Sequence, residues 1–274
     1  MSDFSIIFLL ISSVLYFIGF MFYLIAFSHR RENLFKYGNY IAWSAIAIHT
    51  CSIIFRGIAA GYFPITRLYE TLSFFSWCIV LLFLILNYSY ELRIMGLLIL
   101  PFSFICLGYA LMVPKTMTPL APVLRSKLFE IHIIIAFLSY ASFVIAFVTG
   151  LIYLFQERKI KSKSKSMWHY HLPSLEVVDE VNYRSIIFGF PLFTLSIIIG
   201  VIWAQQVIGS YWNWDPKEVT AFVTWLIYAI QLHTRIASGW RGRKTAILSI
   251  IGFLVVLFSY LGLHYLGLGF HTYG

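Results

Sequence analysis

Charged residues are scarce in this chain of 274 residues, where Asp, Glu, Lys and Arg make up 11% and hydrophobic residues make up 60%. A soluble domain averages roughly 25% charged residues, so this balance excludes a soluble globular protein. Cysteine is also scarce, and the three cysteines form no CxxC pair. Because Cys51, Cys78 and Cys106 all lie in apolar segments, we interpret them as small core residues rather than redox or metal-binding groups.

Motifs that carry common enzymatic chemistry are missing as well. The sequence has no Ser-His-Asp set with plausible spacing, no HExxH motif, no phosphate-binding loop and no facing carboxylates. It also shows no internal repeat and no sign of a second domain. We therefore expect residues 1–274 to form a single polytopic membrane domain.

Apolar runs long enough to cross a bilayer dominate the chain, since a spanning helix needs about 20 residues. They cover residues 5–27, 38–56, 70–87, 94–112, 130–155, 186–208, 218–236 and 244–265. An unsatisfied backbone group in lipid costs several kcal/mol, so each run is expected to be helical. The predicted fold is an all-α bundle of about eight transmembrane helices. The N-terminus has no basic segment or cleavage site, so its run is expected to be a retained span.

Lysine and arginine are distributed unevenly between alternate loops. About 14 of them fall in residues 28–37, 87–93, 156–185 and 235–244, against about 6 in the other loops. The positive-inside rule therefore places this first set in the cytoplasm, and both termini and residues 203–218 on the outer side. The basic loop at 156–185 is expected to be solvated, and nucleic-acid binding is not expected. Within it, residues 173–184 are expected to form a short amphipathic helix on the inner surface.

The segment YWNWDPKE, residues 211–218, concentrates aromatic side chains at a predicted helix start. Asp215 is a favourable N-cap, Pro216 suits the first helical position, and Glu218 completes a capping box. Tryptophan and tyrosine are enriched at any membrane interface. A helix start and an ordinary aromatic belt are therefore one interpretation of this segment, with the belt formed by Trp203, Tyr211, Trp212 and Trp214.

The placement of histidines favours a more specific interpretation. His132 lies near the outer start of the predicted fifth span, and His271 lies just outside the last span. Both fall on the side predicted for the tryptophans, whereas His233 lies near the inner end of the seventh span. Haem is a flat apolar group whose iron accepts axial histidine ligands, and aromatic faces stack on such a disc. The two outer imidazoles beside an aromatic segment therefore favour a haem site.

Four stretches carry a resemblance to a known family. WAQQVIGSYWNWDPKEVTAFVTWLIYAIQLHTR resembles a tryptophan-rich WWD segment with its following helix, and GFPLFTLSIIIG resembles the span before it. PITRLYETLSFFSW resembles an outer-loop P-x-T-N-L-Y-E-S pattern, and GLGFHTYG resembles a terminal G-L-H-S-Y. Over about residues 38–274 the chain thus resembles the haem-handling WWD-domain proteins, and within them the CcsA/ResC-type cytochrome c biogenesis family, a component of the system II haem lyase.

This resemblance implies a function. Such a protein takes haem across or within the membrane, holds it at an outer His/Trp site and presents it for thioether attachment to the CxxCH motif of apocytochrome c. The implied substrate is haem b, and the implied enzymatic role is part of a haem lyase. Implied partners are a CcsB/ResB-type membrane protein, apocytochrome c and a thiol-reducing thioredoxin-like protein. The expected location is the bacterial cytoplasmic membrane or the thylakoid membrane, with the WWD segment facing the periplasm, outside or lumen.

The resemblance also implies roles for individual residues. His132 and His271 ligate haem iron beside the WWD segment, and His233 ligates it at an inner site whose second ligand comes from the partner. The haem-binding segment then includes Trp203, Tyr211, Trp212, Trp214 and Asp215.

Three positions depart from the family pattern, namely Ile208 in place of Trp, Arg67 in place of Asn and His264 where Asn is common. Arg67 is an outer cation and is predicted to pair with a haem propionate. His264 and His49 stay open as further ligands.

Two alternative functions also stay open. One is a CcmC-like haem exporter or chaperone-loading protein, which shares the WWD segment and two outer histidines. The other is an unrelated polytopic transporter with interrupted spans in both halves.

Overall fold

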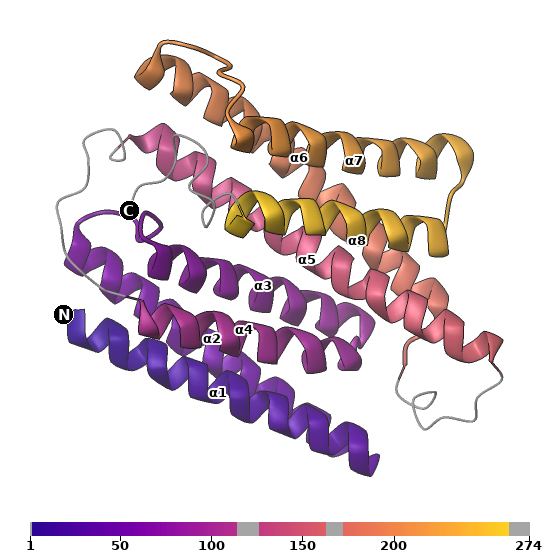
Figure 1. Cartoon of the computed structure of the whole chain (residues 1–274). Coiled ribbons are helices and arrows are strands. Elements are labelled where there is room, and N and C mark those ends of the chain that lie inside the picture. Colours follow the sequence, from indigo (N-terminus) through magenta and orange to yellow (C-terminus); the bar gives the residue numbers. More distant parts are fainter. Residues whose placement is uncertain (1, 114–125, 163–171, 263–274) are drawn as a thin grey trace. The chain divides into compact units, whose positions relative to one another are not determined.

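The computed structural model describes residues 2–113, 126–162 and 172–262, and these described residues form helices without strands. They fall into two compact units, the first built from α1–α4 and the second from α5–α8 (Figure 1). The first unit contains α1 (Ser2–His29), α2 (Glu32–Ala60), α3 (Leu68–Tyr90), the 3-10 turn η1 (Arg93–Met95) and α4 (Gly96–Met112). The second contains α5 (Lys127–Lys161), α6 (Leu175–Ile208), α7 (Pro216–Ser238), α8 (Arg243–Leu257) and the π-helical turn η4 (Phe258–Gly262).

Seven stretches of helix in the described part of the chain are long and apolar enough to cross a membrane. They are α1 to α6, with η1 joined to α4, and α8 continued into η4. The prediction of an all-α polytopic membrane protein is therefore confirmed. α7 does not belong to this set, so the eighth span predicted at 218–236 stays a prediction. The single domain expected over residues 1–274 also stays a prediction.

In the first unit, α1 packs along α2 and α4, and α3 packs along α4. A buried ion pair joins two of these helices, with Arg56 Nη2 of α2 lying 2.8 Å from Glu70 Oε1 of α3. The other carboxylate oxygen of Glu70 accepts hydrogen bonds of 3.2 Å from the backbone N–H groups of Thr66 and Arg67. Glu70 therefore both pairs the arginine and satisfies amide groups at the start of α3.

In the second unit, α5 packs along α6 and α8, while α7 packs against α8 and α6. Aromatic rings fill the interior between these helices. Phe143 of α5 stacks on Tyr228 of α7 with ring centroids 3.8 Å apart, and it meets Phe193 of α6 edge-on at 5.7 Å. Such pairs add about 0.5–1.5 kcal/mol each beyond the area they bury. This core fixes the helices that carry most of the predicted site residues.

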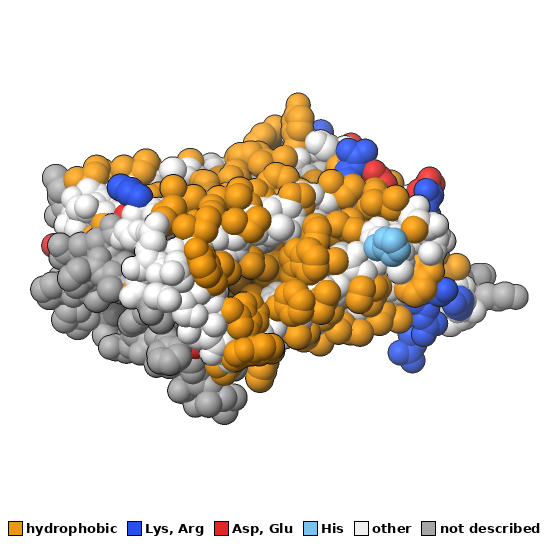
Figure 2. Space-filling view, turned by 90° about the horizontal axis from the view of Figure 1, so that it is seen from above, with side chains coloured by type: hydrophobic (Ala, Val, Ile, Leu, Met, Phe, Trp, Pro, Cys, Tyr) orange, Lys and Arg blue, Asp and Glu red, His pale blue; other side chains and the backbone are white. Residues whose placement is uncertain are grey.

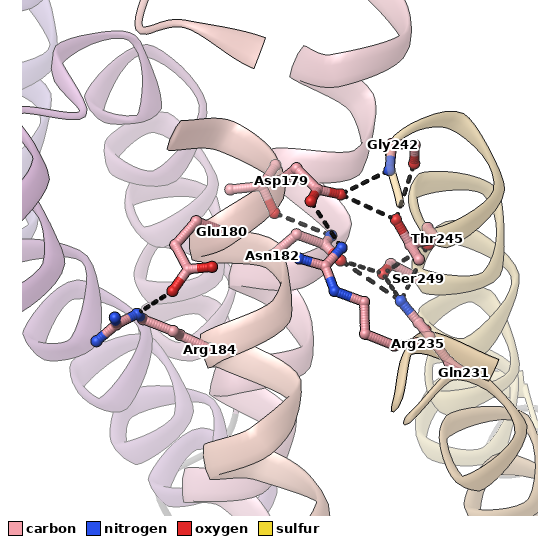
Figure 3. Close-up of polar contacts among 10 residues, drawn as sticks. Asp179, Glu180, Asn182, Arg184, Gln231, Arg235, Gly242, Thr245 and Ser249 are labelled. Atoms are coloured by element: carbon pink, nitrogen blue, oxygen red, sulfur yellow. Dashed lines mark hydrogen bonds and ion pairs between the residues drawn. The ribbon is translucent and has the colours of Figure 1, made fainter. Parts of the chain in front are cut away.

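A polar clamp ties together the start of α6, the end of α7 and the start of α8 (Figure 3). Asp179 accepts hydrogen bonds from Arg235 Nη1 at 2.6 Å, from the Gly242 backbone N–H at 2.7 Å and from Thr245 Oγ1 at 3.2 Å. Arg235 and Asp179 are both largely buried, so losing either partner would leave a poorly solvated charge. Hydrogen bonds among three buried side chains continue the network, namely Asn182, Gln231 and Ser249.

Residues 173–184 do not form the separate surface helix that was predicted. They open the long helix α6, where Ser174 Oγ caps the first turn by accepting from Val177 N–H at 3.3 Å. Val178 and Val181 are buried. The separate-helix prediction was wrong because the helix continues without interruption past Gly189 and Pro191 to Ile208. The predicted basic loop is likewise shortened by α5, which extends to Lys161.

The surface composition agrees with a membrane protein. Figure 2 shows hydrophobic side chains covering much of the face in view, while most of the visible Lys and Arg side chains gather toward one end. Large apolar side chains are exposed on described helices of both units. Large apolar side chains exposed along a helix are expected where that helix contacts lipid.

Candidate functional site

His132 lies in the second turn of α5, and its ring is bonded to α6. The Nδ1 atom lies 2.7 Å from the backbone carbonyl oxygen of Ser196. A carbonyl oxygen only accepts hydrogen bonds, so Nδ1 carries a hydrogen and donates it, and in the neutral ring Nε2 keeps its lone pair. The Ser196 hydroxyl in turn donates to the His132 carbonyl at 3.3 Å. Metal-ligating histidines usually make this kind of bond through the nitrogen that does not bind metal.

The ring of His132 also packs directly against the α6 backbone at Gly200. A Cβ atom placed on Gly200 would lie 2.7 Å from His132 Cε1 and 2.9 Å from Nδ1. In the next layer along the same two helices, buried Trp203 packs against Phe129 with ring centroids 5.1 Å apart. The sequence therefore places a glycine where the imidazole needs space and a tryptophan one turn further along α6.

The loop between α6 and α7, residues 210–215, is named here the WWD loop. α6 ends at Ile208, eight residues beyond Gly200, which corresponds to about 12 Å along a helix. His132 therefore lies about two helical turns from the point where α6 leads into this loop. Of the predicted site residues, Trp203 lies five residues before the end of α6, and Tyr211, Trp212, Trp214 and Asp215 lie in the loop itself.

The predicted capping box at the start of α7 is confirmed, with Asp215 as its N-cap. Asp215 Oδ1 accepts from the Lys217 N–H at 2.8 Å. Glu218 Oε2 accepts from the Asp215 N–H at 3.3 Å and, outside the capping box, from the Asn213 N–H at 2.8 Å. Glu218 thus anchors the WWD loop as well as the helix. Sequence reasoning assigned it only to the cap, since the capping-box pattern does not report a bond that reaches five residues back.

The aromatic side chains of the WWD loop differ in exposure. Trp212 is half-buried and meets Trp214 edge-on at 5.7 Å and Phe222 of α7 at 6.3 Å. Tyr211 and Trp214 are 61% and 77% exposed, so both present large apolar surfaces outward. Trp214 also has a φ of 57°, a left-handed conformation that costs a residue with a Cβ roughly 1–2 kcal/mol. Strain of this size persists where the surrounding bonds hold it, which is common in ligand-binding loops.

Lys217 adds positive charge beside the WWD loop. It lies in the first turn of α7, next to the N-cap Asp215. Burial lowers the pKa of Lys217, and the nearby Asp215 carboxylate partly offsets this effect. The start of α7 therefore combines a half-buried ammonium group and the positive end of a helix dipole with the carboxylates of Asp215 and Glu218, which accept its amide hydrogens.

His233 lies far from the WWD loop in the same unit. It is 17 residues beyond Pro216, which is about 26 Å along α7. Its side chain is exposed. The spacing of four, four and three residues puts it on one face of α7 with three exposed apolar side chains, Phe222, Leu226 and Ile230. The structure therefore separates His132 and His233, as expected for two distinct sites.

The remaining predicted ligands are placed as follows. His271 and His264 lie outside the described residues. His49 is fully buried in the first unit, with Nδ1 3.1 Å from Tyr16 Oη and Nε2 2.9 Å from Ser73 Oγ. Both ring nitrogens of His49 are thus engaged, which makes it an unsuitable iron ligand. Arg67 lies directly before α3 in the first unit.

Comparison with known proteins decides the family. The profile of the cytochrome C assembly protein family matches residues 65–271. The chain belongs to this family. It is 36% identical over 287 residues to the cytochrome c biogenesis protein CcsA of Guillardia theta, with 97% of this chain and 93% of the relative covered. It is 38% identical to CcsA of Prochlorococcus marinus strain MIT 9301, with 82% and 80% covered.

Two further matches are partial in length. The CcsA of Chlamydomonas reinhardtii is 38% identical, and this chain covers 64% of it. Among solved structures, cytochrome c heme lyase CcmF matches with a TM-score of 0.68 at 13% identity, over 96% of this chain and 48% of that one. This chain therefore spans about half the length of CcmF and shares the fold of the matching half. Family membership identifies it as a membrane component of cytochrome c biogenesis.

Proposed function

We propose that this chain is the component of a cytochrome c haem lyase that holds haem and presents it for attachment. Haem b is its substrate, taken up across or within the membrane. At the WWD end of the second unit, His132 and His271 are the axial ligands of the iron. Trp203 lies between His132 and the WWD loop along α6, and Tyr211, Trp212, Trp214 and Asp215 form and order the aromatic surface of this site.

The hydrogen bond between His132 Nδ1 and the Ser196 carbonyl is the observation that carries this proposal. In the neutral ring this bond puts the hydrogen on Nδ1 and leaves the lone pair on Nε2, which is the state that a metal-ligating imidazole requires. It also orients the ring, as bonds to the non-ligating nitrogen do in metal sites. The ring lies about two helical turns from the point where α6 leads into the exposed aromatic loop, in the same unit as that loop.

The WWD loop supports a flat apolar substrate. Trp212 and Trp214 stand edge-on to each other, so one ring can lie along a macrocycle face while the other contacts its rim. Lys217 offers a cation to the haem carboxylates at this end of the unit. Arg67 is proposed as a second cation for a propionate.

The attachment step is the addition of each cysteine thiol of CxxCH across a haem vinyl group. A carbon–sulfur bond forms at one vinyl carbon, and the S–H bond and the C=C π bond break. The thiol hydrogen ends on the other vinyl carbon, so the step consumes no oxidant. The CxxCH histidine replaces one axial ligand. This chain contributes positioning, which can supply several kcal/mol of the barrier, while haem supplies the reactive groups.

A second haem position is proposed at His233. Its imidazole is exposed on an apolar face of α7, and an ionisable side chain in that setting usually has a partner in a membrane. A CcsB/ResB-type protein supplies the second axial ligand there. The end of the unit near His233 faces the cytoplasm, and the WWD loop faces the periplasm or the thylakoid lumen. A thioredoxin-like protein keeps the apocytochrome cysteines reduced.

The proposal is tested by co-expressing the chain with a CcsB/ResB-type partner and an apocytochrome in a host without its own maturation system. Covalent haem on the cytochrome is detected by peroxidase staining after denaturing electrophoresis. A cytochrome whose CxxCH cysteines are replaced by serine is the control. We expect staining only when this chain and the cysteines are both present. A complex that retains haem but attaches none would instead support the haem-exporter alternative, and a complex without haem would refute both.

A further inference from the structure

Backbone groups of α6 form most of the seat of His132, and the Ser196 hydroxyl adds a side-chain contact 3.3 Å from Nδ1. One side of the ring is bonded to a backbone carbonyl, that of Ser196, and the ring edge lies against the backbone of Gly200 one turn later. Residues four apart lie on the same helix face, so both contacts meet the same imidazole. The distances of 2.7 and 2.9 Å from a hypothetical Gly200 Cβ to ring atoms are shorter than nonbonded carbon contacts of about 3.5 Å.

An alanine at Gly200 would therefore have to displace the ring. The imidazole is not the free end of a flexible chain, because its Nδ1–H is held by a 2.7 Å bond and its backbone carbonyl accepts from the Ser196 hydroxyl. Displacement either lengthens the Nδ1–H bond or rotates the ring about its two side-chain torsions. The first change frees the ring to take the other tautomer, and the second turns Nε2 away from its present direction.

We propose that Gly200 and the Ser196 carbonyl are positioning elements for His132, which together determine the nitrogen offered to the substrate iron and its direction. This inference rests on the proposed function, because it assumes that haem is the ligand of Nε2. It goes beyond that function by assigning a role to residues that contact His132 and are not themselves proposed as iron ligands. Changes in such supporting bonds typically alter metal affinity about 10- to 100-fold.

The same pair of helices provides a matched control. A Cβ on Gly189 of α6 would lie 2.9 Å from Ser142 Cβ and 3.0 Å from Phe143 Cε1 of α5, which is similar crowding away from His132. Gly108 of α4 has open space around it, with nothing within 4 Å of an added Cβ. Gly189→Ala therefore reports the general effect of crowding between α5 and α6, and Gly108→Ala reports the effect of alanine in a helix.

The experiment has one readout without haem and one with it. The chain is labelled with nitrogen-15 in its histidine rings, and the Nδ1-protonated signal of His132 is identified by its loss in His132→Ala. The complex with the CcsB/ResB-type partner is then titrated with haem. We expect Gly200→Ala to shift the His132 signal and to weaken haem retention about 10- to 100-fold. Added imidazole, a free replacement ligand, should restore the absorption spectrum. Gly189→Ala and Gly108→Ala should change neither readout.

The outcomes separate this inference from the proposed function. If Gly200→Ala retained haem as well as the wild type does while His132→Ala lost it, the positioning role would be overturned and the ligand assignment would stand. Retention in His132→Ala itself would overturn the ligand assignment. If Gly200→Ala and Gly189→Ala lost haem equally and imidazole did not restore the spectrum, crowding between α5 and α6 would explain the whole effect.

Discussion

Glu218 is predicted to hold the WWD loop in place more strongly than Asp215, although Asp215 belongs to the named motif. Glu218 Oε2 accepts the Asn213 N–H at 2.8 Å and the Asp215 N–H at 3.3 Å. Hydrogen bonds to a charged group contribute about 1.5–3 kcal/mol when well formed. One of these bonds is long and the site is half-buried, so we assign about 2 kcal/mol to the pair. Loss of the Asp215 cap costs about 1 kcal/mol.

These magnitudes translate into different rates of loop opening. Each 1.4 kcal/mol is a factor of ten, so Glu218→Ala should raise the open population of the loop roughly 30-fold, and Asp215→Ala about 5-fold. Chymotrypsin cleaves after aromatic residues, of which the loop has three, Tyr211, Trp212 and Trp214. When reclosing is faster than cleavage, the cleavage rate follows the open population. Glu218→Gln keeps the acceptor without its charge and should fall between wild type and Glu218→Ala.

The assay is chymotrypsin cleavage of the purified, detergent-solubilised chain, with fragments identified by mass. Cleavage between residues 211 and 214 should follow the order Glu218→Ala, Asp215→Ala, wild type. Haem retention should follow the opposite order, highest in wild type and lowest in Glu218→Ala, because a disordered loop loses its aromatic surface. Equal cleavage in all three proteins, or faster cleavage in Asp215→Ala than in Glu218→Ala, would refute this account of the loop.

Three further predictions follow from single contacts. Asp179→Asn leaves buried Arg235 without its counter-charge and should lower stability by about 3–5 kcal/mol in thermal melts. Glu180→Gln breaks an exposed pair and should cost under about 1 kcal/mol, and similar losses in the two variants would contradict the clamp. Trp214→Gly relieves the positive φ, so it should leave stability unchanged or raise it by about 1 kcal/mol while weakening haem retention. A Trp214→Gly variant that is less stable than the wild type but retains haem equally well would contradict this prediction. His49→Phe leaves two buried hydroxyls unsatisfied and should destabilise the first unit by about 1–3 kcal/mol, without altering the haem spectrum; an altered spectrum would make His49 a ligand after all.

Local patterns predicted the helices and the start of α7 well. The capping box of Asp215 and Glu218 was readable because its residues are adjacent and its bonds are local. The apolar runs were readable because a bilayer demands their length. The predicted ends of the helices were less accurate. The span expected at 38–56 is part of a helix over Glu32–Ala60. Hydropathy marks only the apolar part of a helix, and polar residues on either side of it can continue the helix.

Contacts between helices that are distant in the sequence could not be predicted from sequence patterns. His132 was chosen for its place near a span end, but its tautomer depends on Ser196, 64 residues away. A glycine at position 200 carries no signal that it faces an imidazole. The clamp at Asp179 joins residues up to 66 positions apart, and the same aspartate was expected on a surface helix. Such features follow from the pairing of α5, α6, α7 and α8, which hydropathy does not specify.

The central claim is that His132 Nε2 ligates haem iron at the WWD end of the chain. The most direct test is the visible absorption spectrum, after reduction, of the purified complex with a CcsB/ResB-type partner, compared between wild type and His132→Ala. The account predicts a bis-imidazole haem spectrum in the wild type that is lost or altered in His132→Ala. A wild-type complex without haem, or an unchanged spectrum in His132→Ala, would contradict it.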